Sequence, residues 1–239
     1  MTKIGIIGMG KIGKKYYQLI DSGQIANAEI GGLCRWEFPS YTDLIDSGEC
    51  DSVIVCTPHS SHYDIGKYAL NAGLKTLVDK PLSLNENEYQ ELIDLGAYTA
   101  FNTKFEGKLY AEKEIQWHVN WYRPESYYSG WRGIDGHILW TMSIHNIELL
   151  LWSFGYPKII YSYADHYNID CLLDFNGVRC EYRASTNQQD FPEFLKIDGE
   201  ISKRRKHDHI TLLQKFVDNT LEKPTMDIYY LIQNLLTTS

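Results

Sequence analysis

The chain has 239 residues, of which 44% are hydrophobic and 13% aromatic, so it can bury the cores of two modest domains. Its formal net charge of -8 argues against a general affinity for nucleic acid or for acidic membranes. The sequence contains no apolar stretch of the ~18 residues that a membrane span needs, and an apolar strand predicted from Lys3 leaves no room for a signal peptide.

Taken in chain order, the first hundred residues alternate between short apolar strands and amphipathic helices. Strands are predicted at residues 3–7, 28–34, 52–56, 75–79 and 98–101. Helices are predicted at residues 11–21, 41–47, 61–72 and 83–96. The last of these opens with a capping-box pattern at Ser83 and Glu86. Such alternation is typical of a parallel, doubly wound α/β sheet.

The segment between the second strand and the second helix is unusually short. Between Cys34 and Tyr41 there are too few residues for another helix and strand, because a complete crossover needs at least ~10 residues. We therefore expect a trimmed Rossmann sheet.

Beyond about residue 104 the hydrophobic pattern becomes that of an antiparallel sheet. Apolar residues at positions 115, 117, 119 and 121 alternate strictly with polar ones. Asn176-Gly177 predicts a hairpin between residues 169–175 and 178–184, and Asp198-Gly199 predicts a second. Helices are predicted at residues 143–154, 208–221 and 226–236. We expect a Rossmann domain at residues 1–103 and a smaller, mainly antiparallel α+β domain at residues 104–239.

A glycine motif joins the first strand to the first helix. The pattern is G-x-G-x-x-G, and its members are Gly8, Met9, Gly10, Lys11, Ile12 and Gly13. Because it follows a strand and opens a helix, its glycines can form a tight turn and let the backbone approach a pyrophosphate. The phosphate would bind at the helix N-terminus. The alternative, a purely structural glycine turn, lacks this reason for the spacing, so the motif predicts a dinucleotide cofactor.

The end of the second strand bears on the choice between NAD and NADP. An acidic residue normally binds the adenosine ribose there, and this chain has Arg35. An arginine removes the repulsion that a carboxylate exerts on a 2'-phosphate and offers two donors to it. NADP is therefore the predicted cofactor, although Glu37 is close enough to keep NAD possible. A solvated surface arginine is the structural alternative.

Two further groups of polar residues follow the next buried strands. Thr57, Pro58 and His62 come after the third strand, and Asp79 and Lys80 end the fourth. Open α/β sheets bind their ligands at this carboxyl edge. We therefore include all five residues in the predicted cofactor site, and we expect burial beside a nicotinamide to lower the pKa of the lysine.

These motifs together resemble the Gfo/Idh/MocA family, the group of glucose-fructose oxidoreductase and inositol dehydrogenase. The resemblance begins with the glycine turn, Thr57-Pro58 with His62, and Asp79-Lys80-Pro81. It continues nearly to the end of the chain, in the segment 101–105, Trp131-Arg132, Ser143-Ile144-His145, and the stretch from His209 through Phe216-Val217 to Pro224.

The resemblance implies an NAD(P)-dependent oxidoreductase that transfers hydride between nicotinamide and a hydroxyl or carbonyl of a sugar, polyol or nucleotide sugar. It implies that Lys80 is the family's active lysine and His145 its catalytic histidine. Two positions depart from the family pattern. Thr141 stands where the family has an aspartate, and Ser143 stands where it has a glycine. This departure leaves an alternative open, a non-catalytic relative that binds the dinucleotide as a sensor or assembly partner.

The predicted helix at residues 143–154 places His145 in its first turn, where the helix dipole favours neutral imidazole. Glu148 lies one turn later and could approach the site, but a surface salt bridge is the commoner role for such a residue.

The remaining patterns predict no further ligand. The histidine pairs at 59 and 62 and at 207 and 209 lack a third ligand at recognisable spacing, so no metal is expected. The basic run at 203–206 is expected to be a solvated face. The aromatic residues that alternate along 117–121 are expected to pack on one face of a sheet. Five cysteines without CxxC spacing favour a reducing cytoplasm. One spare sheet face in the second domain predicts a homo-oligomer. The partner implied by the family resemblance is a small-molecule substrate.

Overall fold

The computed structural model describes residues 1–130, 132–133, 136–203 and 207–238. It divides the chain into two compact units. Unit 1 comprises residues 1–105 and 208–225, and unit 2 comprises residues 106–207 and 226–239. The first break lies close to the predicted boundary at residue 103. The segment 208–225 was expected in the second domain, but it packs within unit 1.

Unit 1 is built on a parallel five-stranded sheet with the order β2-β1-β3-β4-β5. Its strands are β1 (Thr2–Ile7), β2 (Ala28–Leu33), β3 (Ser52–Val55), β4 (Lys75–Val78) and β5 (Tyr98–Thr99). The central strands are buried on both faces, as apolar runs predict for a sheet covered by helices. The predicted trimmed Rossmann sheet is confirmed, because only a short loop separates β2 from the next helix.

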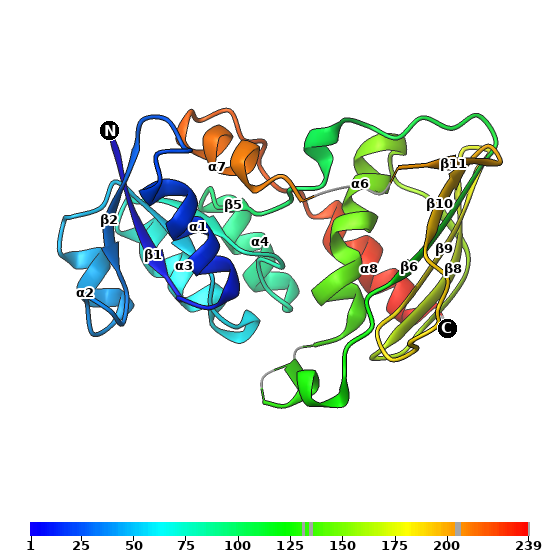
Figure 1. Ribbon diagram of the computed structural model, residues 1–239, viewed down its shortest axis with the longest axis horizontal. Helices are drawn as coiled ribbons and strands as arrows, with labels where there is room; N and C mark the ends of the chain where they lie inside the picture. Colours follow the sequence, from blue (N-terminus) through cyan, green and yellow to red (C-terminus); the bar gives the residue numbers. More distant parts are fainter. Residues whose placement is uncertain (131, 134–135, 204–206, 239) are drawn as a thin grey trace. The chain divides into compact units, whose positions relative to one another are not determined.

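Helices cover both faces of this sheet (Figure 1). They are α1 (Lys11–Asp21), α2 (Tyr41–Asp46), α3 (His62–Asn71), α4 (Glu86–Asp94) and α7 (His209–Val217), with short 3₁₀ turns η1 (His59–Ser61) and η2 (Lys104–Glu106). Side chains of α1 and α7 share one buried cluster with alternate residues of the sheet. The predicted capping box is wrong in its position: Asn85 caps α4, and the Ser83 hydroxyl donates to Glu88 at 2.5 Å instead.

Three side-chain interactions hold the returning segment 208–225 in unit 1. Phe216 is fully buried, with the Tyr98 ring edge-on at 5.6 Å and the Lys75 ammonium 4.5 Å from its ring centroid. Lys75 also donates to the backbone carbonyl of Val217. Because the burial of an aromatic side chain dominates local packing energy, Phe216 explains why α7 belongs to this unit.

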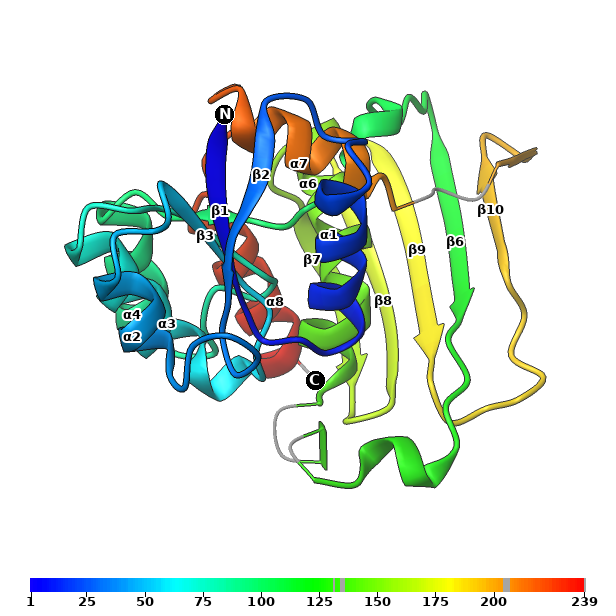
Figure 2. The same cartoon turned by 60° about the vertical axis from the view of Figure 1, so that its left-hand side comes forward.

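Unit 2 contains a six-stranded mixed sheet with the order β11-β10-β6-β9-β8-β7. Figure 2 shows its strands side by side. They are β6 (Glu114–Asn120), β7 (Lys158–Ala164), β8 (Asn168–Phe175), β9 (Val178–Ser185), β10 (Phe194–Ile197) and β11 (Glu200–Ser202). Among these described strands only the β6–β9 pair is parallel. The mainly antiparallel second sheet is thus confirmed.

Turn residues fix the two hairpins of this sheet. Asn176 and Gly177 have φ of 55° and 101° between β8 and β9, as a two-residue hairpin turn requires. Asp198 and Gly199 have φ of 50° and 88° between β10 and β11. Asp198 also accepts three backbone N–H bonds from residues 112–114, and these bonds hold the pKa of its carboxyl below the usual range.

One face of the unit 2 sheet packs against helices α6 (Ile144–Phe154) and α8 (Asp227–Thr237). The Ser162 hydroxyl of β7 donates to the Leu235 carbonyl of α8 at 2.7 Å. A 3₁₀ turn, η3 (Glu125–Tyr128), follows β6. None of the helices in the described part of the chain has the length and apolar character of a membrane span.

The start of the α6 helix differs from the sequence expectation. A π-helical segment, η4 (Leu139–Ser143), leads directly into α6, and Ser143 and Ile144 both have helical dihedrals. The helical conformation therefore runs from Ile138, and His145 lies well inside it. The prediction that His145 occupies the first turn is wrong, and the dipole argument built on that position does not apply. π-helical turns occur frequently at functional sites.

Candidate functional site

The glycine turn has the geometry that its spacing predicts. Gly8 has φ of 99°, and a Cβ built on it would lie 2.7 Å from the backbone of Cys56. A Cβ on Gly13 would lie 1.9 Å from the carbonyl oxygen of Gly8. These two glycines are therefore required for the turn and for close helix–strand packing.

Gly10 differs from the other two glycines, because a Cβ built on it would meet no atom within 4 Å. It is the N-cap residue of α1, no side chain caps the helix, and no acidic residue stands in the first turn. The first backbone N–H groups and the helix dipole thus favour an anion at an open, uncrowded position. The other motif positions frame this opening, with Met9 and Ile12 packed against the core and Lys11 exposed.

The end of β2 carries an exposed arginine on a tight loop. Arg35 has φ of 70°, and its backbone N–H donates to the Phe38 carbonyl at 2.6 Å. The Glu37 carboxylate folds back and accepts the Leu33 backbone N–H at 2.9 Å. The loop therefore presents a guanidinium to solvent while the nearby carboxylate is engaged by the strand end.

The residues after β3 are joined to those after β4. His62, the first residue of α3, is fully buried. Its Nε2 lies 2.8 Å from the carbonyl oxygen of Thr57, and its Nδ1 lies 2.7 Å from the carbonyl oxygen of Pro81. The Ser61 hydroxyl donates to the Thr57 hydroxyl at 2.8 Å, and Pro58 is exposed between them. The predicted residues at this edge of the sheet are thus brought together within unit 1.

Lys80 follows β4 at this edge and is partly buried. Its backbone N–H donates to the Asp79 carboxylate at 2.9 Å. Burial lowers the pKa of the Lys80 ammonium, and the charge of Asp79 opposes that shift. The lowered pKa agrees in direction with the expectation from sequence, and its main cause is desolvation by the protein.

A second polar group in unit 1 could not be predicted from sequence. His209 Nδ1 lies 3.1 Å from the side-chain amide nitrogen of Asn102 and 3.4 Å from the Tyr16 hydroxyl. Burial raises the pKa of Tyr16, with Asp79 and Cys56 adding to the rise. These residues are up to 193 positions apart, so no local sequence pattern predicts their contact.

His145 belongs to unit 2, where it is 8% exposed. The His207 ring meets its ring edge-on at a centroid distance of 4.7 Å. Thr141, at the position of the family aspartate, donates its hydroxyl to the His137 carbonyl at 3.0 Å. Glu148 is 8% exposed, so the surface salt bridge expected for it is wrong. A buried carboxylate one helical turn from a buried histidine is a candidate site residue that the i, i+3 spacing could have indicated.

Two sequence features lie partly outside the described residues. They are Trp131 of the Trp131-Arg132 pair and residues 204–206 of the basic run. The described residues hold no group of three or more His, Cys, Asp or Glu placed to bind a metal ion.

Comparison with known proteins gives a family match for part of the chain. Residues 26–99 match the oxidoreductase family with an NAD-binding Rossmann fold, GFO_IDH_MocA. An inositol 2-dehydrogenase/D-chiro-inositol 3-dehydrogenase of Lactiplantibacillus plantarum is 29% identical over 112 residues, or 39% of this chain and 31% of that protein. A UDP-N-acetylglucosamine 3-dehydrogenase of Acidithiobacillus ferrooxidans is 30% identical over 104 residues, or 39% of this chain and 33% of that protein.

A solved structure extends the likeness to the whole fold. The WlbA dehydrogenase of Thermus thermophilus, in complex with NAD and alpha-ketoglutarate, superposes with a TM-score of 0.78 at 19% identity, covering 100% of this chain and 96% of that one. At this identity the likeness concerns the fold alone. The matches to the two curated relatives span about a third of their length. The resemblance read from the motifs is thereby confirmed for residues 26–99, which are similar to the NAD-binding Rossmann fold of the Gfo/Idh/MocA oxidoreductases.

Proposed function

We propose that this chain is an NAD(P)-dependent oxidoreductase that acts on a hydroxyl or carbonyl of a sugar, polyol or nucleotide sugar. The observation that carries the proposal is the open Gly10 position on the N-terminus of α1, at the sheet edge that also holds Thr57 and Lys80. The names of the relatives support the substrate class, since they include an inositol dehydrogenase and a UDP-N-acetylglucosamine dehydrogenase. The same Thermus thermophilus enzyme has also been solved with NAD and UDP-GlcNAcA.

The residues present fit a dinucleotide. The α1 N-terminus would hold the pyrophosphate, Arg35 the adenosine ribose end, and the residues after β3 and β4 the nicotinamide end. When bound, the cofactor supplies or accepts the hydride. In this proposal Lys80 and His145 have the roles that the family resemblance implies, active lysine and catalytic histidine, and each would handle a proton of the reacting group.

Gly10→Ala tests the cofactor site with little disturbance to the fold. Gly10 has φ of -74°, which alanine adopts freely, and the added methyl meets no protein atom. We expect an unchanged melting temperature and NAD affinity reduced by about tenfold or more, since the methyl would occupy the path of the pyrophosphate. Isothermal titration calorimetry measures the affinity.

Gly13→Ala is the contrasting variant, because its methyl collides with the Gly8 carbonyl and should lower the melting temperature. Unchanged NAD affinity in a folded Gly10→Ala protein would place the cofactor elsewhere and remove the basis of the proposal.

Within this function we propose NADP as the preferred cofactor. Arg35 is exposed at the end of β2, and the Glu37 carboxylate, two residues further on, accepts the Leu33 N–H. We expect NADP to bind more tightly than NAD and Arg35→Asp to reverse the order, because the aspartate would repel a 2'-phosphate. Lys158→Asp makes the same charge change on an exposed residue of unit 2 and should leave the order intact. Titration showing tighter NAD binding by the unmodified protein would contradict the preference.

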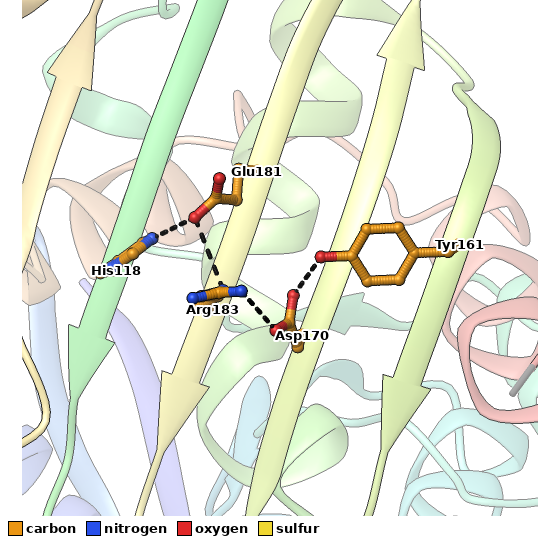
Figure 3. A network of polar contacts seen from close by, with 5 residues as sticks. All are labelled: His118, Tyr161, Asp170, Glu181 and Arg183. Carbon is orange, nitrogen blue, oxygen red and sulfur yellow. Dashed lines mark hydrogen bonds and ion pairs between the residues drawn. The ribbon is translucent and has the colours of Figure 1, made fainter.

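We also propose that the protein forms a homo-oligomer through the outer face of the unit 2 sheet. A chain of polar contacts runs across β6, β9, β8 and β7 on that face, as Figure 3 shows. The Arg183 guanidinium contacts Asp170 at 2.8 Å and Glu181 at 3.5 Å, and Glu181 in turn contacts His118 at 2.7 Å. Tyr161 of β7 completes this chain by donating its hydroxyl to Asp170 at 2.5 Å, and β7 leaves Ile160, Tyr161 and Tyr163 exposed. Sedimentation showing only monomer at micromolar concentration would refute association.

A further inference from the structure

The loop between β2 and α2 packs one aromatic side chain against the protein and leaves a larger one exposed. Phe38 lies so close to Gly32 that a Cβ on this glycine would stand 2.7 Å from the ring. Trp36, two residues earlier in the same loop, is 59% exposed. Single exposed aromatic side chains are common on protein surfaces, so what distinguishes Trp36 is its place in the fold.

Backbone hydrogen bonds hold this loop in one shape. The Leu33 carbonyl accepts three successive backbone N–H groups, those of residues 36–38, at 2.9 to 3.3 Å. The Arg35 N–H donates to the Phe38 carbonyl, and the Glu37 carboxylate accepts the Leu33 N–H. Trp36 therefore stands on a preorganised loop, and little conformational freedom is lost when a ligand binds to it.

The loop begins beside the glycine turn. Strands β1 and β2 are parallel neighbours, and the Cys34 N–H donates to the Ile6 carbonyl, just before that turn, at 3.0 Å. The Tyr17 ring of α1 meets the indole edge-on, at a centroid distance of 6.4 Å and an angle of 60°. Trp36 thus borders the helix whose N-terminus is the proposed pyrophosphate site, and it directly follows Arg35, the proposed ribose residue.

The trimmed sheet leaves this flank of the site open. Strand β2 is the edge strand of the order β2-β1-β3-β4-β5, and residues 34–40 lead from it straight to α2. The usual doubly wound order places a further strand beyond this one. Within the described residues of unit 1 no such strand flanks the loop, so a flat ligand can reach the indole from solvent.

We propose that Trp36 binds the adenine of the dinucleotide, with its indole stacked on the base. When the pyrophosphate lies on the α1 N-terminus and the ribose at Arg35, the base is the one part left to place at this end. The next side chain along the loop is aromatic. Adenine is flat, aromatic and uncharged, so it stacks on an aromatic partner without needing a specific hydrogen bond. This inference deepens the proposed function and rests on it.

Two adenosine nucleotides that lack nicotinamide separate the base from the phosphate. AMP carries the base, and 2',5'-ADP carries the same base with the 2'-phosphate of NADP. Trp36→Ala should weaken the binding of both by about tenfold, the scale of a lost base–aromatic stack. Arg35→Asp should weaken 2',5'-ADP far more than AMP. Nicotinamide mononucleotide should bind equally to the wild type and to Trp36→Ala. Isothermal titration calorimetry measures these affinities.

Tryptophan fluorescence reports the contact itself. Saturation with 2',5'-ADP should quench part of the wild-type emission, because a stacked base quenches an indole, and should leave the emission of Trp36→Phe unchanged. Trp36→Phe keeps an aromatic face and should retain most of the affinity. Tyr110→Ala removes an aromatic side chain of unit 2 that is 81% exposed, and it should match the wild type in both measurements.

The results separate this inference from the proposed function. Equal NADP affinity in the wild type and Trp36→Ala would overturn the adenine role and leave the cofactor site at Gly10 standing. Absence of any NAD or NADP binding by the wild type would sink both. Unchanged nucleotide affinity with loss of self-association in Trp36→Ala, measured by sedimentation, would show that Trp36 binds a second copy of the chain and not adenine. Should Trp36→Ala fail to fold, a wild-type emission that 2',5'-ADP does not quench still contradicts the stacking.

Discussion

Lys80→Met is expected to lower kcat by about 10²- to 10⁴-fold while the protein still binds its dinucleotide, a range typical of a positioned proton donor. Lys80 follows the end of β4 at the carboxyl edge of the sheet, where it is partly buried beside Asp79. Methionine has nearly the same length and no proton to give to a developing alkoxide. Steady-state kinetics on a verified sugar, polyol or nucleotide-sugar substrate, with calorimetry for the cofactor, measures both effects.

The lowered pKa of Lys80 gives this experiment a pH signature. Burial disfavours the ammonium, so the folded-state pKa lies below the unfolded value. An activity that needs the protonated lysine falls as the pH rises through that lowered pKa, earlier than it would for an exposed lysine. The stability effect has the opposite sign, because the burial cost of the ammonium disappears over the same pH range and the folded state gains.

The same strand supplies a matched control. Lys75 begins β4, and burial lowers its pKa as well, but it lies at the amino end of the strand and packs on Phe216. Lys75→Met should cost some stability and leave kcat near its normal value. A Lys80→Met protein with near-normal kcat on a verified substrate would show that the active site has been assigned to the wrong lysine.

His145→Asn is expected to reduce kcat by about 10²-fold or more and to leave dinucleotide binding intact, on the scale of general-base catalysis. His145 is buried on α6 with the His207 ring against it. If its neutral ring accepts the substrate proton, the wild-type rate rises with pH on the acid side, and the variant loses that limb. The pH–rate profile of kcat measures the change.

Thr141→Asp is the companion variant, because the resemblance places a carboxylate at this position. The Thr141 hydroxyl donates to the His137 carbonyl within the π-helical segment, so it supplies no charge. A carboxylate there should raise activity or shift the pH optimum. His166→Asn removes a partly exposed histidine of unit 2 and serves as the control. An unchanged profile in His145→Asn would take the histidine out of the mechanism and favour the non-catalytic, dinucleotide-binding alternative.

Local sequence alone determined most of the secondary structure of this protein. Helix α1 was predicted with its observed limits, because a glycine motif opens it and a Ser-Gly pair ends it. The turns Asn176-Gly177 and Asp198-Gly199 located two hairpins, since few residues other than glycine, asparagine and aspartate adopt positive φ readily. The glycine turn could be predicted on similar grounds, because Gly8 has positive φ and neither Gly8 nor Gly13 has room for a Cβ, whereas the position of Gly10 is open.

Only the tertiary structure decided how distant segments combine. Strand β7 was not predicted, since its pattern alternates weakly and three of its large side chains are exposed. The return of residues 208–225 to unit 1 depends on Phe216 meeting Tyr98 and Lys75, more than a hundred positions away. The π-helical entry to α6 moved His145 out of the first turn, and the folded loops gave His62 two carbonyl partners. Hydrophobic periodicity shows which face of a helix or strand is apolar. The element that packs against that face is determined by contacts across the whole unit, which no local pattern contains.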